Sequence, residues 1–258
     1  MILVLDIGNT NVKLGVFENE KLKGTWRIST DLRKTSDEYG IAVIEMLKTA
    51  DVTPDDIEGI IMSSVVPAIN FTIEHMLTDY IHKKPIIVGA GIRTGLNIKI
   101  DNPKETGGDI ICDAVSAIKR YGGPVITIDF GTATTICATN ENNEFLGGCI
   151  LAGVRVASDA LSSKTANLPA VALDLPESII GKNTVQCMQA GLLYGYIGQI
   201  EYIIGKMKTE KGFENAKVIA TGGLAKTIAV HTKVIDVVDS RLTLEGLRII
   251  YNMNKEVK

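Results

Sequence analysis

The chain has few of the residues that build metal cages. It contains three histidines, four cysteines and one tryptophan in 258 residues, and aromatic residues make up 5%. The cysteines show no CxxC spacing and the histidines lie far apart in the sequence, so a structural zinc site is not expected. We expect the cysteines to be buried free thiols in a reducing cytoplasm.

Charge of one sign and long apolar runs are also scarce. The net charge is −3, and Lys and Arg are scattered and do not form the basic stripe that is typical of nucleic-acid binding. No apolar run is long enough to span a bilayer. The opening MILVLDIGNT lacks a basic segment, so it predicts a buried strand and not a signal peptide. We therefore expect a cytoplasmic protein that binds neither nucleic acid nor a membrane.

What the chain does have is an internal repeat. Residues 5–24 (LDIGNTNVKLGVFENEKLKG) align without a gap to residues 128–147 (IDFGTATTICATNENNEFLG), at a constant offset of 123. In both copies an apolar strand ends in Asp-x-Gly, a Thr-bearing turn follows, and two further strands are separated by a Glu-Asn turn. The repeat predicts one βββ unit that is used twice.

Strands alternate with helices in both halves, which predicts an α/β fold with two related domains, 1–120 and 121–258. The long segments 90–108 and 165–183 are expected to be loops, and such loops are often functional. The expected strands cover 2–6, 12–17, 22–29, 59–63, 85–88, 125–129, 134–139, 145–151, 217–220 and 234–238. The expected helices cover 35–50, 68–80, 109–120, 154–163, 183–208 and 243–254.

The first Asp-x-Gly turn has the residue types that bind phosphate. Gly8 allows close backbone approach, and Asn9, Thr10 and Asn11 offer amide and hydroxyl donors. Asp6 can hold Mg²⁺ through water, because Mg²⁺ keeps much of its hydration shell. In the same stretch, Lys13 would add a positive charge. The alternative is an ordinary hairpin in which Gly and Asn serve only the turn.

The second copy, Asp129-Phe-Gly-Thr-Ala-Thr-Thr135, repeats the carboxylate, the glycine and the hydroxyl groups. If the two copies are related by a pseudo-two-fold axis, their turns would face each other across a cleft that binds a polyphosphate and its metal. A third element is Thr221-Gly222-Gly223, a strand end followed by glycines that open a helix, which can accept a nucleoside or phosphate.

These elements resemble the superfamily of sugar kinases, hsp70 chaperones and actin. Within it, the chain is similar over nearly its whole length to type III pantothenate kinases. The motifs that carry the resemblance are DIGNTN (6–11), DEYG (37–40), DNPKETGGD (101–109), DFGTATT (129–135), TANLP (165–169), GKNT (181–184), ATGG (220–223) and LTLEGL (242–247).

The resemblance implies a duplicated actin-like, ribonuclease H-like ATPase fold around a nucleotide cleft. It also implies transfer of phosphate from ATP to pantothenate, the first step toward coenzyme A, with Mg²⁺, a monovalent cation (K⁺ or NH₄⁺) and a homodimer. The apolar residues of the 183–208 helix would form the dimer interface or, equally, plain core.

The resemblance also implies residue roles. Asp109 would be the general base, with an N-cap as the alternative interpretation. Asp129 would bind the monovalent cation, and Asp6 would place Mg²⁺. The residues expected to bind ATP are Asp6, Ile7, Gly8, Asn9, Thr10, Asn11, Val12, Lys13, Gly131, Thr132, Gly222 and Gly223. Those expected to bind the substrate are Ile100, Gly107, Gly108, Asp109, Ile110 and Thr184; for Thr184 a helix-start hydroxyl beside Asn183 is the alternative.

Three positions depart from the family pattern. Ile110 stands where the family has Arg, Ile100 where it has Tyr, and Ala152 where it has Pro. Losing a charge-assisted hydrogen bond costs about 1.5–3 kcal/mol, so these changes would weaken the affinity for the substrate. They would leave the expected phosphate-binding residues intact. Three readings stay open: a pantothenate kinase with other substrate donors, a kinase for another alcohol or sugar, and a nucleotide-binding regulator.

Overall fold

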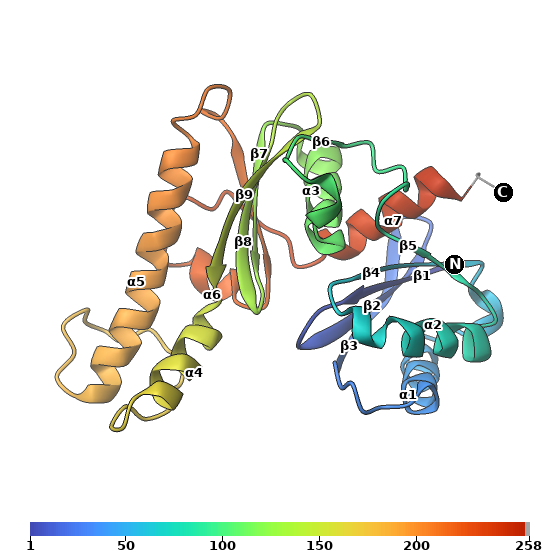
Figure 1. Ribbon diagram of the computed structural model, residues 1–258, viewed down its shortest axis with the longest axis horizontal. Coiled ribbons are helices and arrows are strands. Elements are labelled where there is room, and N and C mark those ends of the chain that lie inside the picture. Colours follow the sequence, from blue (N-terminus) through green and yellow to red (C-terminus); the bar gives the residue numbers. More distant parts are fainter. Residues whose placement is uncertain (256–258) are drawn as a thin grey trace. The chain divides into compact units, whose positions relative to one another are not determined.

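The computed structural model describes residues 1–255, which divide into two compact units (Figure 1). Unit 1 comprises residues 1–96, 101–116 and 241–255, and unit 2 comprises residues 97–100 and 117–240. This division differs from the predicted split after residue 120, because the last helix belongs with the first unit. Within residues 1–255, no helix combines the length and apolar character needed to cross a membrane.

Unit 1 is built on a five-stranded sheet in the order β3-β2-β1-β4-β5. β1 pairs antiparallel with β2 and parallel with β4. The strands are β1 (Ile2–Ile7), β2 (Asn11–Glu18), β3 (Lys21–Ser29), β4 (Gly59–Ser64) and β5 (Pro85–Ile87), and the helices are α1 (Ser36–Lys48), α2 (Pro67–Ile81) and α7 (Leu242–Asn254). The helix α3 (Gly108–Tyr121) begins in unit 1, and its residues 117–121 belong to unit 2.

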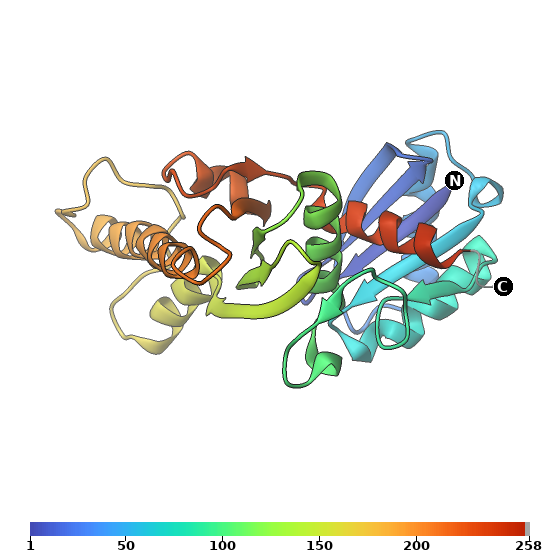
Figure 2. The ribbon, with the colours of Figure 1, turned by 90° about the horizontal axis from the view of Figure 1, so that it is seen from above.

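Side chains alternate between the two faces of this sheet, because successive strand residues point in opposite directions. Leu3, Leu5 and Ile7 of β1 join the buried cluster that includes Tyr39 of α1 and Ile73 of α2. The opposite face is covered by α7, which crosses β1, β2 and β4 (Figure 2). Asp6 belongs to this second face by alternation, so its carboxylate lies away from the aliphatic cluster.

Unit 2 repeats the plan in a six-stranded sheet in the order β11-β10-β7-β8-β9-β6. The long helix α5 packs Leu193, Tyr196 and Ile200 against Ile128 and Phe130 of β7. The strands are β6 (Asn97–Ile98), β7 (Val125–Phe130), β8 (Ala133–Thr139), β9 (Glu144–Ala152), β10 (Lys217–Gly222) and β11 (Val237–Val238), and the helices are α4 (Val154–Lys164), α5 (Thr184–Met207) and α6 (Ala225–Ala229).

The strand orders confirm the predicted duplication. Starting from the outer meander strand, β3-β2-β1-β4-β5 corresponds to β9-β8-β7-β10-β11, with the same parallel and antiparallel pairings. β6 is an addition at the β9 edge. The shared topology is that of the predicted duplicated α/β fold.

The two copies align in sequence without a gap, but the strand register shows that they do not correspond residue for residue in space. In unit 1 the first hairpin closes at the pair Ile7 and Val12, which leaves the four residues 8–11 in the turn. In unit 2 it closes at Phe130 and Thr134, which leaves the three residues 131–133. β8 is therefore displaced by one residue relative to the sequence repeat, so the structural counterpart of Lys13 is Thr135.

Other expectations differ in detail. The segment 90–108 contains the short strand β6 and a 3₁₀ turn at Pro103–Glu105, although a loop alone was expected. The cysteines are free, but only Cys112 and Cys137 are buried, and Cys187 is exposed. Cys187 lies in the first turn of α5.

Candidate functional site

Asp6 is held from two sides within unit 1. The Ser63 hydroxyl, which is fully buried, donates to Asp6 Oδ1 at 2.9 Å. The Lys13 ammonium lies 3.2 Å from Asp6 Oδ2. Both partners are cross-strand neighbours, since Asp6 stands opposite Lys13 on β2 and opposite Ser63 on β4. These contacts fix the orientation of a carboxylate that is only 6% exposed.

Asp109 stands in the first turn of α3, one residue after the helix begins at Gly108. The N-cap interpretation is therefore wrong, because the N-cap precedes the first helical residue. Asp109 Oδ1 accepts a hydrogen bond from Ile110 N–H at 2.8 Å. Gly107 makes room for this carboxylate, because a Cβ at Gly107 would lie 2.5 Å from Asp109 Oδ1.

The two carboxylates of unit 1 influence each other. Burial raises the pKa of Asp109, and the negative charge of Asp6 raises it further. Hydrogen bonds from backbone N–H groups and the positive charge of Lys13 oppose this increase. A raised pKa makes the ionised carboxylate a stronger base, which suits a residue that must accept a proton.

The turn between β1 and β2 presents polar groups at the end of the strand. Asn9, Thr10 and Asn11 are exposed, and Gly8 N–H closes the turn on Asn11 O at 3.0 Å. Ile7 and Val12 are buried in the aliphatic core, so only their backbone atoms could contact a ligand. The structure thus brings together Asp6, Lys13 and the turn residues, as the sequence predicted.

Asp129 occupies the corresponding place on β7 of unit 2. It pairs across the sheet with Thr221 of β10, and the next residue, Gly222, packs against its carboxylate. Gly222 has a φ of 95° and no space for a Cβ beside Asp129 Oδ1, so both its backbone and its surroundings require glycine. Tyr196 of α5 lies near Asp129, and burial, together with this negative charge, raises the pKa of its hydroxyl.

The second turn is shorter and packs directly against the chain. Gly153 N–H donates to Thr132 O at 3.0 Å, and Gly131 and Thr132 are exposed. Gly223 N–H donates to Phe130 O at 3.1 Å, which places the predicted glycine pair beside the end of β7. Gly131, Thr132, Gly222 and Gly223 therefore gather in unit 2 at the carboxyl ends of β7 and β10.

The residues predicted to bind the acceptor belong to both units. Gly107, Gly108, Asp109 and Ile110 are in unit 1, whereas Ile100 and Thr184 are in unit 2. Ile110 and Ile100 are half-buried, and the Ile100 Cγ2 methyl packs near Gly147. The last of the set, Thr184, is exposed and is the first residue of α5.

The cap of α5 is formed by Asn183, whose side chain accepts from Gln186 N–H at 2.9 Å. The alternative interpretation of Thr184, a hydroxyl at a helix start beside an Asn cap, therefore describes its position correctly. A helix-start hydroxyl is also free to contact a ligand, so this placement leaves the substrate-binding role as a prediction.

Two residues near the carboxylates, Ser63 beside Asp6 and Tyr196 near Asp129, were not predicted to have a role. Ser63 was expected only as the end of a strand, and Tyr196 was placed in a helix without a role. Ser63 could have been found, because polar residues at the carboxyl end of a strand beside Asp6 are typical of ligand sites in α/β sheets. Tyr196 gave no such signal. Its hydroxyl bonds Thr134 Oγ1, a contact that depends on how α5 packs on the sheet.

The carboxylates fit the metals that the sequence suggests. No group of three or more His, Cys, Asp or Glu side chains that could hold an ion occurs among residues 1–255. Mg²⁺ does not need one, because it commonly binds one or two carboxylates, waters and substrate phosphates. Asp6 and Asp109 supply two neighbouring negative charges of this kind, and Asp129 is a single carboxylate suited to a monovalent cation.

The family model described as type III pantothenate kinase matches residues 2–206. The chain belongs to this family. Family membership makes the protein a kinase, which uses ATP, a divalent metal and a small-molecule acceptor. The match includes both Asp-x-Gly turns and Asp109, and it ends near the end of α5.

Solved structures show the same fold at low sequence identity. A protein from Campylobacter jejuni, described provisionally as a Baf family transcriptional activator, has a TM-score of 0.62 at 18% identity over 98% of both chains. An inorganic polyphosphate/ATP-glucomannokinase from an Arthrobacter species has a TM-score of 0.51 at 15% identity, over 100% of this chain and 99% of its own. A hexokinase of the ROK type from Thermus thermophilus has a TM-score of 0.50 at 13% identity, over 100% and 99%.

Proposed function

We propose that the protein phosphorylates pantothenate with ATP, the first step of coenzyme A biosynthesis. The observation that carries the proposal is the arrangement of Asp109 beside Asp6 and Lys13 in a chain of the type III pantothenate kinase family. Asp109 is buried enough to have a raised pKa, and it stands where the family motif GGD places the general base.

In the proposed reaction the pantothenate hydroxyl attacks the γ-phosphorus of ATP. The hydroxyl proton passes to an oxygen of Asp109, an oxygen–phosphorus bond forms, and the bond from the γ-phosphorus to the β–γ bridging oxygen breaks to release ADP. Phosphoryl transfer of this kind depends mostly on positioning and charge stabilisation. Lys13 and the N–H groups of the first turn would bind the phosphates, and Mg²⁺ placed by Asp6 would neutralise their charge.

The second turn would contact the same nucleotide through Gly131, Thr132, Gly222 and Gly223. Asp129 would hold K⁺ or NH₄⁺. We infer that Ile100 and Ile110 leave the pantothenate carboxylate to other donors, among which Thr184 is a candidate. A cytoplasmic location stays a prediction.

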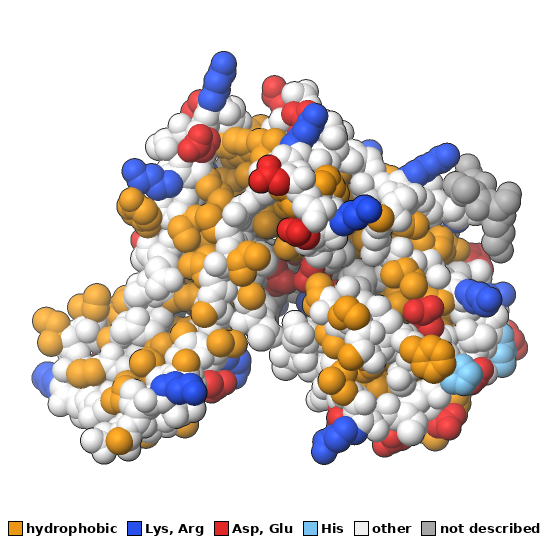
Figure 3. Space-filling model, in the orientation of Figure 1, with side chains coloured by type: hydrophobic (Ala, Val, Ile, Leu, Met, Phe, Trp, Pro, Cys, Tyr) orange, Lys and Arg blue, Asp and Glu red, His pale blue; other side chains and the backbone are white. Residues whose placement is uncertain are grey.

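A homodimer is the expected assembly. Apolar side chains are exposed on α4, on the loop before α5 and at the start of α5, in the lower left of Figure 3. Ile179 is 65% and Ile180 77% exposed, which is unusual for large apolar residues outside an interface. The exposed apolar residues are Val156, Leu161, Ile179, Ile180 and Val185. Sedimentation analysis tests this expectation.

The test is a coupled assay of ADP release with ATP, Mg²⁺, K⁺ and pantothenate. We expect turnover in the unmodified protein and a loss of about 10²–10⁴-fold in Asp109→Asn, the usual contribution of a general base. Asp55→Asn, a change of an exposed carboxylate in a distant 3₁₀ turn, is the matched control. Turnover with a sugar or another alcohol but not with pantothenate would favour a different kinase. ATP binding without turnover on any acceptor would favour the regulator.

Asp109→Asn also separates catalysis from folding. The ionised form of Asp109 is disfavoured in the folded chain, since burial and Asp6 raise its pKa. The neutral amide removes that penalty at pH 7, where an unperturbed carboxyl would be ionised. We therefore expect the variant to unfold at a higher Tm than the unmodified protein while losing turnover. A lower Tm would mean that the turnover loss reflects damage to the fold.

A further inference from the structure

The DEYG motif, residues 37–40, has no part in the proposed chemistry, and most of it serves local packing. Asp37 accepts a hydrogen bond from the Tyr80 hydroxyl at 2.8 Å. Glu38 closes the capping box of α1 with Thr35. At Gly40 there is no space for a Cβ, because Tyr80 Cε2 would lie 2.6 Å from it. These three residues join α1 to its cap and to α2.

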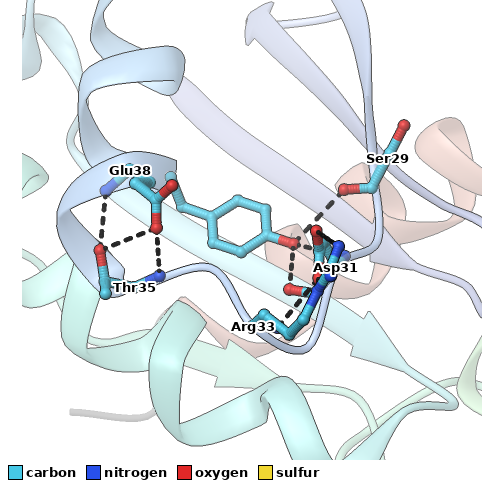
Figure 4. Close-up of polar contacts among 6 residues, drawn as sticks. Ser29, Asp31, Arg33, Thr35 and Glu38 are labelled. Carbon is cyan, nitrogen blue, oxygen red and sulfur yellow. Dashed lines mark hydrogen bonds and ion pairs between the residues drawn. The ribbon is translucent and has the colours of Figure 1, made fainter.

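Tyr39 has a different set of partners (Figure 4). Its side chain is fully buried, and its hydroxyl accepts from Asp31 N–H at 2.9 Å. The same hydroxyl can donate to Asp31 O at 3.1 Å or Ser29 O at 3.3 Å. Tyr39 thus binds the backbone on both sides of Thr30, at the end of β3.

Asp31 is also held through its side chain. Arg33 donates from its backbone N–H and its guanidinium to the Asp31 carboxylate, at 3.0–3.1 Å. These hydrogen bonds lower the pKa of Asp31 to about 2. The carboxylate is therefore ionised throughout the neutral range, and the bend after β3 keeps the same contacts there.

Thr30 connects this bend to the first phosphate turn. Its N–H donates to Thr10 O at 3.0 Å, and its hydroxyl donates to Gly8 O at 2.7 Å. In a trans peptide the C=O and the following N–H point in opposite directions. Fixing Gly8 O toward Thr30 therefore directs Asn9 N–H to the opposite side of the turn, where it can serve as a phosphate donor.

The second unit shows what the hydroxyl contributes. Gly153 corresponds to Thr30, and its N–H makes the equivalent bond to Thr132 O at 3.0 Å. A Cβ at Gly153 would lie 2.6 Å from Gly131 O, so the shorter turn packs directly on the backbone. In the first unit the longer turn is joined at this place by the Thr30 hydroxyl, which donates to Gly8 O.

We propose that Thr30 and Tyr39 are positioning residues that hold the phosphate turn of residues 8–11 in its ligand-binding form. This inference rests on the proposed nucleotide site. It assigns the DEYG motif an indirect role, in which α1 fixes Tyr39, Tyr39 fixes the bend, and Thr30 fixes the turn.

The first experiment measures the Kd of Mg·ATP by calorimetry and the KM values of both substrates. Thr30→Val keeps the shape and removes the hydroxyl, and Tyr39→Phe removes only the phenol oxygen. We expect each to weaken ATP binding about 3- to 10-fold, the value of one net hydrogen bond, with the KM of the acceptor unchanged. Thr30→Ser should restore binding. Tyr80→Phe is the matched control, because it also removes a phenol oxygen, and the Tyr80 hydroxyl donates to Asp37 and not to the bend after β3 or to the turn of residues 8–11.

Loss of Tm without a change in the Kd of ATP in Thr30→Val and Tyr39→Phe would overturn the inference. So would an equal loss of affinity in Tyr80→Phe.

The second experiment needs no ligand, and it separates this inference from the nucleotide proposal. Hydrogen exchange of the amides of residues 8–11 should be faster in Thr30→Val and Tyr39→Phe than in Tyr80→Phe. Unchanged exchange would overturn the inference even if the unmodified protein binds ATP. If the unmodified protein binds no ATP, the proposed function fails. The exchange result then still shows whether Thr30 and Tyr39 hold the turn of residues 8–11.

Discussion

The two β-meanders share a topology but differ at the turn that follows the Asp-bearing strand. In β1–β3 the turn has four residues, and the Thr30 hydroxyl joins it to the neighbouring bend. In β7–β9 it has three residues, and it lies directly on Gly153. The longer turn exposes more backbone donors and depends on side chains for its shape, whereas the shorter one is fixed by backbone contact.

The two copies also differ in the charge of the residues around their aspartates. Lys13 lies opposite Asp6, and its ammonium contacts that carboxylate, while the neutral Thr135 lies opposite Asp129. On the other neighbouring strand, Ser63 of β4 donates to Asp6, and Thr221 of β10 pairs with Asp129. The first copy therefore holds its carboxylate in a charged cluster that includes Asp109. In the second copy the two cross-strand neighbours of the carboxylate, Thr135 and Thr221, are neutral.

Within the comparison of the two copies, the largest expected effect comes from changing the two equivalent carboxylates separately. Asp6→Asn should lower kcat/KM about 10- to 100-fold, the usual effect of a residue that acts on a metal through a bound water. Asp129→Asn should instead remove the dependence of turnover on K⁺, because its proposed ligand is the monovalent cation. Both are measured by varying Mg²⁺ and K⁺ independently. If both variants lost their response to the same ion, the division of roles between the two copies would be wrong.

A smaller effect should distinguish how the two turns are held. Gly153→Ala places a methyl group against Gly131 O and Thr132 O, and overpacking of this kind costs about 1–3 kcal/mol. Thr30→Ala loses one hydrogen bond, worth about 0.5–1.5 kcal/mol. Thermal unfolding should therefore show a larger fall in Tm for Gly153→Ala, at about 2–4 °C per kcal/mol. A larger fall for Thr30→Ala would mean that the second turn can move aside.

Much of this comparison was predictable from the sequence. Apolar strands ending in Asp-x-Gly are a local signal, so the duplicated meanders and the positions of Asp6 and Asp129 followed directly. The role of Asp109 was predicted only by resemblance to a family, since Asp109 follows Asp6 by 103 residues and the segment 90–108 that leads to it was expected to be a loop.

The remaining features depend on packing and register. The first turn of the second meander is one residue shorter than that of the first meander, and its second turn, at residues 141–143, is one residue longer. The two differences cancel, so the sequences align without a gap although β8 is displaced by one residue. Lys13 and Thr135 therefore correspond in space but not in the repeat. Tyr39 gave only the signal of a buried helix face, and its hydroxyl contacts depend on where α1 meets the end of β3. The sequence of the last helix, α7, does not indicate that this helix packs in unit 1.

The smallest effect tests the electrostatic difference itself. Asp109 acts as a base only when ionised, so turnover falls as the pH drops through its pKa. Lys13 lowers that pKa and Asp6 raises it, so Lys13→Met should move the acid limb of kcat/KM for the acceptor to higher pH. Asp6→Asn should move it to lower pH. Thr135→Val, at the equivalent place in the second copy, should leave it unchanged.

The pH dependence of stability has a predictable sign as well. Because the pKa of Asp109 is raised in the folded chain, folding gains stability as the pH falls through that value, and it loses this contribution at higher pH. Lys13→Met should enlarge the gain, since removing the ammonium disfavours the ionised form further. Urea unfolding at low, constant ionic strength and at a series of pH values measures this gain. A gain that stays unchanged in Lys13→Met would show that the ammonium does not act on Asp109, and the charged cluster of the first copy would then be limited to Asp6 and Lys13.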